Sequence, residues 1–248
     1  MIPTAAIVVF ALLCFVAAYV QTLTGFAFGL LLMGAVVLMN LMPLPEAAIV
    51  ISLLTLANAF MVLAQGWRNV AMRPFFWALA GAVPMIVAGY VALELLASTS
   101  LSVLSLVLGL VIIVSSFQLI RRPSPLDRLS RPAGFIFFGG LGGLMGGLFS
   151  TAGPPLVFHF YRQPLAHSAI RETLVAIFAI NSLFRLCVVG ASGGWENHAL
   201  VWAIAGLPAV LCATYLARRW PPPLTPSNLR RIAFILLLLS GLSLIVPG

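Results

Sequence analysis

The sequence predicts an all-α polytopic membrane protein of about 8–10 helical segments, arranged as two inverted repeats with broken helices. Three observations predict it: a very apolar composition, apolar stretches of membrane-spanning length along the chain, and a resemblance between its two halves. Of the 248 residues, 62% are hydrophobic and 7% are charged, whereas about a quarter of the residues of soluble domains are charged. We therefore expect one transmembrane domain over residues 1–248 and no separate soluble domain.

The charge balance is typical of a membrane protein. All 13 basic residues are arginine and five residues are acidic, giving a net charge of +8. Most arginines fall in short loops between apolar stretches, where they set topology, so we expect no nucleic-acid partner. No basic region precedes the first apolar run, which predicts a retained membrane helix and not a cleaved signal. Cys14, Cys187 and Cys212 form no CxxC pattern and are expected to be buried apolar side chains.

Ten apolar segments are expected, five in each half of the chain. They run over about 4–23, 26–42, 46–65, 75–96 and 100–120, and then over 133–149, 154–162, 168–190, 198–217 and 228–246. The basic loop 121–132 separates the halves. At about 1.5 Å per residue, segment 154–162 is too short to cross a bilayer, so we expect it to pair with 133–149 around a break. Segments one and two are open to the same arrangement, and whether either pair spans fully or forms a half-membrane hairpin is left open.

The second half resembles the first at an offset of about 123 to 125 residues. The matched positions are Asn58 with Asn181, Pro84 with Pro208, and Tyr90 with Tyr215. We predict two copies of one unit, over about residues 1–122 and 132–248. An odd number of segments in each copy places the copies in opposite orientation, an arrangement typical of secondary transporters.

Alternation of the segments separates the loop arginines from three glutamates. The arginine side holds Arg68, Arg73, Arg121, Arg122, Arg128, Arg131, Arg162, Arg171, Arg218, Arg219, Arg230 and Arg231. The other side holds Glu46, Glu94 and Glu196. The excess of arginine makes its side cytoplasmic, so we expect a protein of the inner membrane with both termini outside.

Two breaks, TLTGFAFG at 22–29 and STAGPP at 150–155, are predicted to mark a cavity. Backbone at membrane depth is tolerated only where protein or a wet cavity satisfies it. A helix that restarts at Pro154 presents the positive end of its dipole to anions. The candidate ligands are Ser150, Thr151 and Gly153 in the second break, and Gln21, Thr22 and Thr24 in the first. A simple helix kink is the alternative interpretation.

Arg185 is the sharpest functional signal in the chain. It is the only arginine that this topology places inside a span, where a charge is costly and marks a functional site. Its guanidinium is expected to lean toward Asn181, one turn earlier on the same helix face, and the two together suit an oxyanion. An arginine that snorkels to the outer membrane surface is the alternative. Asn58 is equally consistent with a ligand and with an interhelical hydrogen bond, and Val62 matches Arg185 in the first copy.

His159 and Glu172 are the titratable candidates for proton coupling, with a structural role as the alternative for the histidine. The sequence has no His/Glu/Cys spacing typical of a metal site, no Ser/His/Asp arrangement for nucleophilic catalysis, and no Walker-type phosphate loop. We therefore expect no cofactor, no enzymatic activity and no ATP-driven motor within the chain.

The breaks and the turns that follow them resemble those of one known family. The motifs are TGFAFG at 24–29 and GGLFSTAGPP at 146–155, each followed by a Pro-containing turn (MPLPEAA, RQPLAHSAIRETL) and a helix that carries an asparagine. In order, duplication and spacing they are similar to the TauE/SafE family of sulfite and organosulfonate transporters, also called the toluene-sulfonate uptake permease family. This resemblance covers most of the chain, and it implies secondary transport of small sulfur-containing anions such as sulfite or sulfoacetate.

The function expected from these observations is transport of a small anion across the inner membrane by alternating access. Arg185 and Asn181 are expected to bind the anion between the breaks. The rival hypotheses are an anion channel and a membrane-embedded enzyme or assembly scaffold. The sequence leaves open the substrate, the direction of transport, a coupling proton or ion, and a homodimeric state.

Overall fold

The computed structural model describes residues 3–99, 101–120, 126–151, 153–195, 198–221 and 235. Within these ranges it contains nine α-helices, one short 3₁₀ helix and no β-strand. The elements are α1 (Thr4–Thr24), α2 (Phe28–Leu38), α3 (Leu44–Gly66), η1 (Trp67–Asn69), α4 (Met72–Thr99), α5 (Leu101–Ile120), α6 (Pro132–Phe149), α7 (Pro154–Tyr161), α8 (His167–Ser192) and α9 (Ala199–Arg219). The predicted last segment, 228–246, lies outside the described residues except for residue 235.

The predicted all-α, polytopic class is confirmed. In the described part of the chain, α1, α3, α4, α6, α8 and α9 are long and apolar enough to cross a membrane. Helices α2 and α7 have 11 and 8 residues, or about 16 Å and 12 Å, so neither reaches across a bilayer. The segment expected over 26–42 is shorter because the left-handed residues Gly25 and Ala27 delay its start, and a turn with a left-handed Asn40 follows its end.

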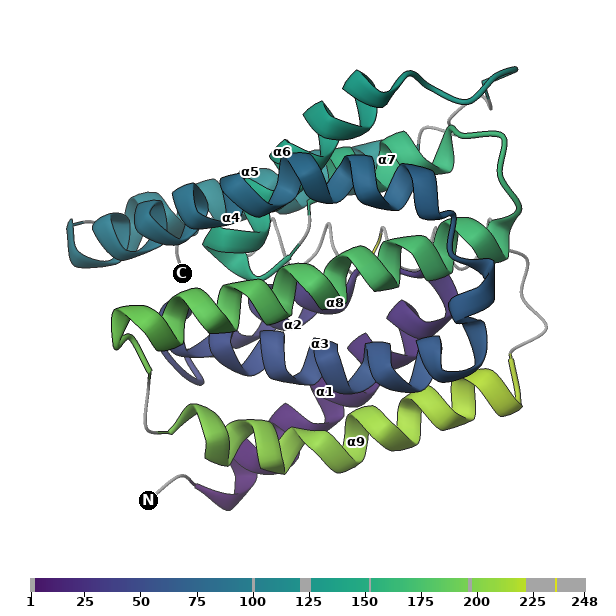
Figure 1. The fold of residues 1–248 in the computed structure, drawn as a ribbon. Coiled ribbons are helices and arrows are strands. Elements are labelled where there is room, and N and C mark those ends of the chain that lie inside the picture. Colours follow the sequence, from purple (N-terminus) through teal and green to yellow (C-terminus); the bar gives the residue numbers. More distant parts are fainter. Residues whose placement is uncertain are drawn as a thin grey trace.

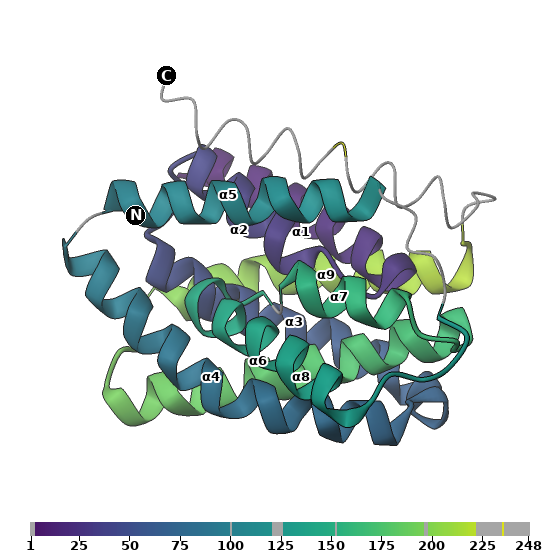
Figure 2. The same ribbon diagram turned by 90° about the horizontal axis from the view of Figure 1, so that it is seen from above.

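Each break turns the chain back on itself. Figure 1 shows that α1 runs toward one end of the molecule and α2 returns, and that α6 and α7 do the same in the opposite direction. Helix α3 runs antiparallel to α8, against which it packs, and the view from above agrees (Figure 2). The closest packing joins the halves: α1 lies along α9, and α4 lies along α6.

The described arginines other than Arg185 gather at one end of the molecule. This end holds η1, the segment before α6, the α7–α8 connection and the last turn of α9 (Figure 1). Its arginines are Arg68, Arg73, Arg128, Arg131, Arg162, Arg171, Arg218 and Arg219. Glu46 and Glu94 lie toward the opposite end, on the first turn of α3 and the last third of α4. Arg121, Arg122, Arg230, Arg231 and Glu196 lie outside the described residues.

Glycines allow α4 and α6 to pack backbone against backbone. A Cβ added to Gly139, Gly143 or Gly147 would fall 2.1 to 2.2 Å from a carbonyl oxygen of α4, and Gly81 and Gly89 of α4 approach α6 in the same way. Small residues in a shared seam let transmembrane helices approach closely and gain dispersion energy. Helix α6 is therefore fixed against α4, and its C-terminal end is placed with it.

The outer surface is apolar, as a surface in contact with lipid requires. Large apolar side chains such as Leu12, Phe60 and Ile204 are more than 60% exposed. Cys14 is buried as expected, but the prediction of burial is wrong for Cys187 and Cys212, which are exposed. Both lie on spans whose apolar outer face carries a cysteine as readily as a core does.

Gly143→Ala is expected to destabilise the protein by about 2 kcal/mol or more, because its Cβ would lie 2.2 Å from the carbonyl oxygen of Ala82 and the helices would have to separate. Gly140→Ala is the matched control on the same helix, since its nearest neighbour would be 3.5 Å away. Thermal unfolding of both variants in detergent checks this. Equal unfolding midpoints would contradict the packing described.

Candidate functional site

A buried cavity of about 20 Å³ lies where the two breaks meet. Its lining comes from both breaks and from α3, α6 and α8: Gln21, Ala27, Gly29, Thr55, Gly146, Ser150, Thr151, Phe178, Asn181 and Ser182. Its volume is about the space of one water molecule. The lining of the cavity therefore includes Gln21, Ser150, Thr151 and Asn181 of the predicted site.

The backbone of both breaks is bent into left-handed conformations beside this cavity. Ala27 has φ 88° and Ser150 has φ 53°, and such angles cost about 1 to 2 kcal/mol in residues with a side chain. The two breaks touch, because a Cβ on Gly29 would lie 2.8 Å from the carbonyl oxygen of Ser150. Strain of this kind persists where the surrounding structure enforces it, which is common at ligand sites.

Gln21 closes the first break by hydrogen bonding at both ends of its amide. Its Oε1 accepts from the backbone N–H of Phe28 at 3.2 Å, and its Nε2 donates to Oδ1 of Asn58 at 3.0 Å. Asn58 in turn donates from Nδ2 to the hydroxyls of Thr22 (2.9 Å) and Thr214 (2.8 Å). Because every group of its amide is used within the protein, Asn58 holds α1, α3 and α9 together.

Asn181, the counterpart of Asn58, is in the opposite situation. It is 4% exposed, and neither its Nδ2 nor its Oδ1 has a hydrogen-bond partner. Leaving a buried polar group unpaired costs about 1–3 kcal/mol, so a buried amide without partners calls for an explanation. Asn181 is one of the residues that line the cavity.

The two breaks differ in the side chain that lies next to the asparagine. Helix α1 ends at the left-handed residue Gly25, and α6 ends at the left-handed residue Ser150. Gln21 and Gly146 each lie four residues before these ends, so they occupy equivalent positions. A Cβ on Gly146 would have only Asn181 Nδ2 within 4 Å, at 3.9 Å. The glutamine that satisfies Asn58 thus has no equivalent beside Asn181, and the space it would fill remains open.

Arg185 is buried beside the cavity but does not line it. It is 1% exposed, its Nε donates to the carbonyl oxygen of Gly147 at 3.1 Å, and its guanidinium lies 5.9 Å from the ring centre of Tyr90. Its Nη1 has no partner, and it makes no hydrogen bond to Asn181. This burial excludes the snorkelling alternative. The guanidinium places a positive charge at the C-terminal end of α6, where a helix dipole favours it.

Two further predicted ligands belong to the breaks but not to the cavity lining. The hydroxyl of Thr24 donates to backbone oxygens of Val20 and Phe26, at 2.7 and 2.9 Å. Gly153 packs against Met145. The first two residues of α7 are prolines, which have no N–H, so its first turn offers fewer amide donors than an ordinary helix start.

Three hydroxyl residues near the site were missed in the sequence. Thr55 and Ser182 line the cavity, and Ser52 lies 2.6 Å from Ser150, hydroxyl oxygen to hydroxyl oxygen. Ser52, Thr55 and Asn58 are spaced three apart on α3, which makes one polar stripe on an apolar helix. That stripe was the signal that could have found them.

The titratable candidates lie away from the cavity. His159 stacks on Phe138, with ring centres 4.5 Å apart, and packs edge-on against Phe135. Glu172 lies on the first turns of α8, at the arginine-rich end, in an ion pair with Arg171. Among the residues that the structure describes, no three His, Cys, Asp or Glu side chains are placed to hold a metal ion.

Comparison with known proteins identifies the family. The model of the family described as sulfite exporter TauE/SafE matches residues 10–244. The chain belongs to the TauE/SafE family. The probable sulfite/organosulfonate exporter TauE of Cupriavidus necator is 38% identical over 230 residues, which cover 93% of this chain and 90% of that protein. No solved structure matches the chain.

Membership in the TauE/SafE family confirms the resemblance that the motifs at the two helix breaks indicated. It also establishes that the protein is a membrane transporter. The TauE/SafE family is one of membrane exporters and not of enzymes. With six described helices able to cross a membrane, the chain is a multi-pass transporter of the inner membrane.

The two asparagines are expected to respond differently to truncation. Asn58→Ala should lower the free energy of unfolding by about 2 kcal/mol or more, because it leaves Gln21 and two hydroxyls without their partner. Asn181→Ala should change it by less than about 0.5 kcal/mol, because no protein hydrogen bond is lost. Thermal unfolding of both variants measures the difference. A large loss for Asn181→Ala would mean that its amide is structural.

Proposed function

We propose that this protein is a secondary transporter that binds sulfite or an organosulfonate such as sulfoacetate in the cavity between the two breaks. The observation that carries the proposal is the buried, unpartnered amide of Asn181, a residue that lines that cavity. The family and the exporter name of the relative from Cupriavidus necator support a sulfur oxyanion as cargo.

The chemistry of the lining suits an oxyanion. The amide N–H groups of Asn181 and the hydroxyls of Ser150, Thr151 and Ser182 are neutral donors, and sulfite and sulfonate oxygens are acceptors. Gly29 lies in the first turn of α2, where backbone N–H groups lack intrahelical partners and the dipole is positive. No acidic side chain lines the cavity. Neutral donors hold an anion without a permanent salt bridge, which favours its release.

In this proposal Arg185 acts through its field. It lies one helical turn from Asn181, and its bond to Gly147 places it next to Gly146 in the cavity wall. The positive charge offsets the cost of bringing an anion into a buried site, since charges interact strongly where water is excluded. The guanidinium stays bound to α6 and Tyr90 while it does so.

Two inverted repeats, over about residues 1–122 and 132–248, supply the means of alternating access. This part of the proposal is supported by the opposite directions of α1 and α6, of α3 and α8, and of α4 and α9 (Figure 1). The packing of α1 against α9 and of α6 against α4 also supports it, because α1 corresponds to α6 and α4 to α9 in the two proposed repeats. Because the broken hairpins come from different repeats, a tilt of one against the other opens the site to one side at a time. The cavity has room for about one water molecule, so in this proposal it widens to admit the anion.

Counterflow in proteoliposomes tests the transport function. Vesicles preloaded with unlabelled sulfite or sulfoacetate should accumulate labelled anion in a saturable manner, and sulfate and simple carboxylates serve as specificity controls. Resolvable single-channel currents in a planar bilayer, with flux that does not saturate, would instead establish an anion channel.

Asn181→Ala is expected to raise KM for the transported anion about tenfold or more, because one hydrogen bond to a charged ligand contributes about 1.5–3 kcal/mol. Gly146→Ala should also weaken binding, since its Cβ enters the cavity without touching anything else, while the fold is retained. Concentration-dependent counterflow of both variants checks this. Unchanged KM in both would remove the cavity from the transport path.

Arg185→Lys is expected to retain most of the transport that Arg185→Ala loses, because a lysine keeps the charge and an indirect role needs only the charge. A direct ligand that grips the anion with a guanidinium fork would be lost in both variants. Comparing the KM values of the two variants separates these roles. Equal losses would assign Arg185 as a ligand.

A further inference from the structure

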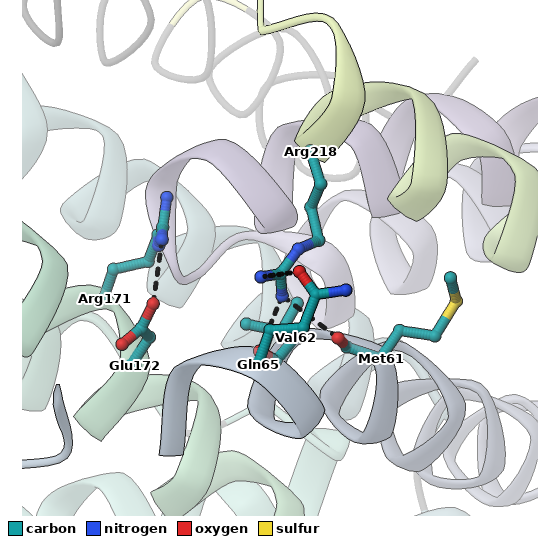
Figure 3. A network of polar contacts seen from close by, with 6 residues as sticks. All are labelled: Met61, Val62, Gln65, Arg171, Glu172 and Arg218. Carbon is teal, nitrogen blue, oxygen red and sulfur yellow. Dashed lines mark hydrogen bonds and ion pairs between the residues drawn. The ribbon is translucent and has the colours of Figure 1, made fainter. Parts of the chain in front are cut away.

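A second polar cluster lies at the arginine-rich end, apart from the cavity. Arg171 Nη2 donates to Oε1 of Glu172 at 2.9 Å, and the Glu172 side chain is 3% exposed against 28% for Arg171 (Figure 3). The two residues are adjacent on α8, and side chains one position apart do not face each other on a helix. The arginine must therefore bend back to reach the carboxylate, so the pair is not an ordinary surface ion pair along a helix face.

This ion pair leaves hydrogen-bonding capacity unused. Glu172 Oε2 and Arg171 Nε are both buried and without a partner. A guanidinium binds a carboxylate or sulfonate most strongly through two parallel N–H bonds. Arg171 makes one such bond to Glu172. Its second donor is available to an anion with better placed oxygens.

The position of Arg171 joins this cluster to the wall of the cavity. A Cβ on Gly25, which ends α1 at the first break, would lie 2.8 Å from Arg171 Cα and 2.9 Å from its Cγ. The next residues of the break, Ala27 and Gly29, line the cavity. Arg171 therefore lies on the arginine-rich side of the break, between the cavity and that end of the molecule.

The Glu172 carboxylate packs against the end of α3. A Cβ on Gly66 would come within 2.5 Å of the carboxylate, so the glycine lets the two approach this closely. Beside it, Arg218 of α9 donates to the carbonyl oxygens of Met61 and Val62 and to Gln65 Oε1, at 3.0, 2.6 and 2.9 Å (Figure 3). Arg218 thus binds the last turns of α3, while the described ion pair of Glu172 is with Arg171.

We propose that Arg171 is a second oxyanion-binding site, on the cytoplasmic side of the cavity, which Glu172 occupies as an internal competitor. A sulfite or sulfonate ion from the cytoplasm takes both donors of Arg171 and displaces the carboxylate. The choice of a sulfur oxyanion rests on the proposed function, whereas the displacement of Glu172 rests on the contacts described.

The test measures anion binding and does not depend on transport. Purified protein is titrated with methanesulfonate and with sulfite, and thermal stabilisation gives an apparent Kd. The series is made in the Asn181→Ala background, which removes the cavity site. Glu172→Gln should lower the apparent Kd at least threefold, because a neutral amide competes less for Arg171. Arg171→Ala combined with Glu172→Gln should abolish this gain, and Arg128→Ala, an exposed arginine at the same end, should leave the Kd unchanged.

An unchanged Kd in Glu172→Gln, or a gain that survives the loss of Arg171, would overturn the proposal. If Glu172→Gln does not purify as a folded protein, Glu172→Asp retracts the carboxylate and should give the same gain. Counterflow in the same variants separates this site from the proposed function. If the variants change the apparent Kd as expected but even the unmodified protein shows no counterflow, the transport function is refuted and the second site stands. If the unmodified protein shows counterflow but the variants leave the apparent Kd unchanged, the second site is refuted and the transport function stands.

Discussion

The structure depends on one constraint: backbone that leaves the helical path at membrane depth must be satisfied by the protein itself. The chain interrupts two helices, and polar groups of each interruption are bound by side chains of α1 and α3. Gln21 provides the bond that the first break needs at Phe28, and Ser52 reaches Ser150 of the second. Because the breaks touch at Gly29 and Ser150, a displacement of either break requires the other to move.

Within this framework, the two breaks differ in how the asparagine beside each of them is bound. The predicted repeat pairs Asn58 with Asn181, but only Asn58 is bound by a glutamine and a threonine of the first break. The second half has Gly146 and Gly147 in their places. One glycine leaves space beside Asn181, and the other offers its carbonyl oxygen to Arg185. The same helix end thus gains a cavity and a buried positive charge.

Much of the fold could be predicted from the sequence, because in a membrane apolar length determines helices and Gly-Pro clusters determine breaks. Nine of the ten expected segments correspond to described helices. The partners of each polar side chain could not be predicted, since they depend on how helices rotate against one another. Arg185 was expected to turn toward Asn181. Its Nε instead donates to the carbonyl oxygen of Gly147, in the last turn of α6. Likewise, Asn58 and Asn181 look equivalent in the sequence and differ only in what surrounds them.

The most direct measurement is the position of a bound anion in an experimental structure determined with selenite, whose selenium is identified by anomalous scattering. Density within hydrogen-bonding distance of the Asn181 amide, between Gly29 and Thr151, is the expected result, with Gln21 still bound to Asn58. An anion held elsewhere in the membrane domain, with the Asn181 amide still unpartnered, would contradict the assignment of this cavity as the substrate site.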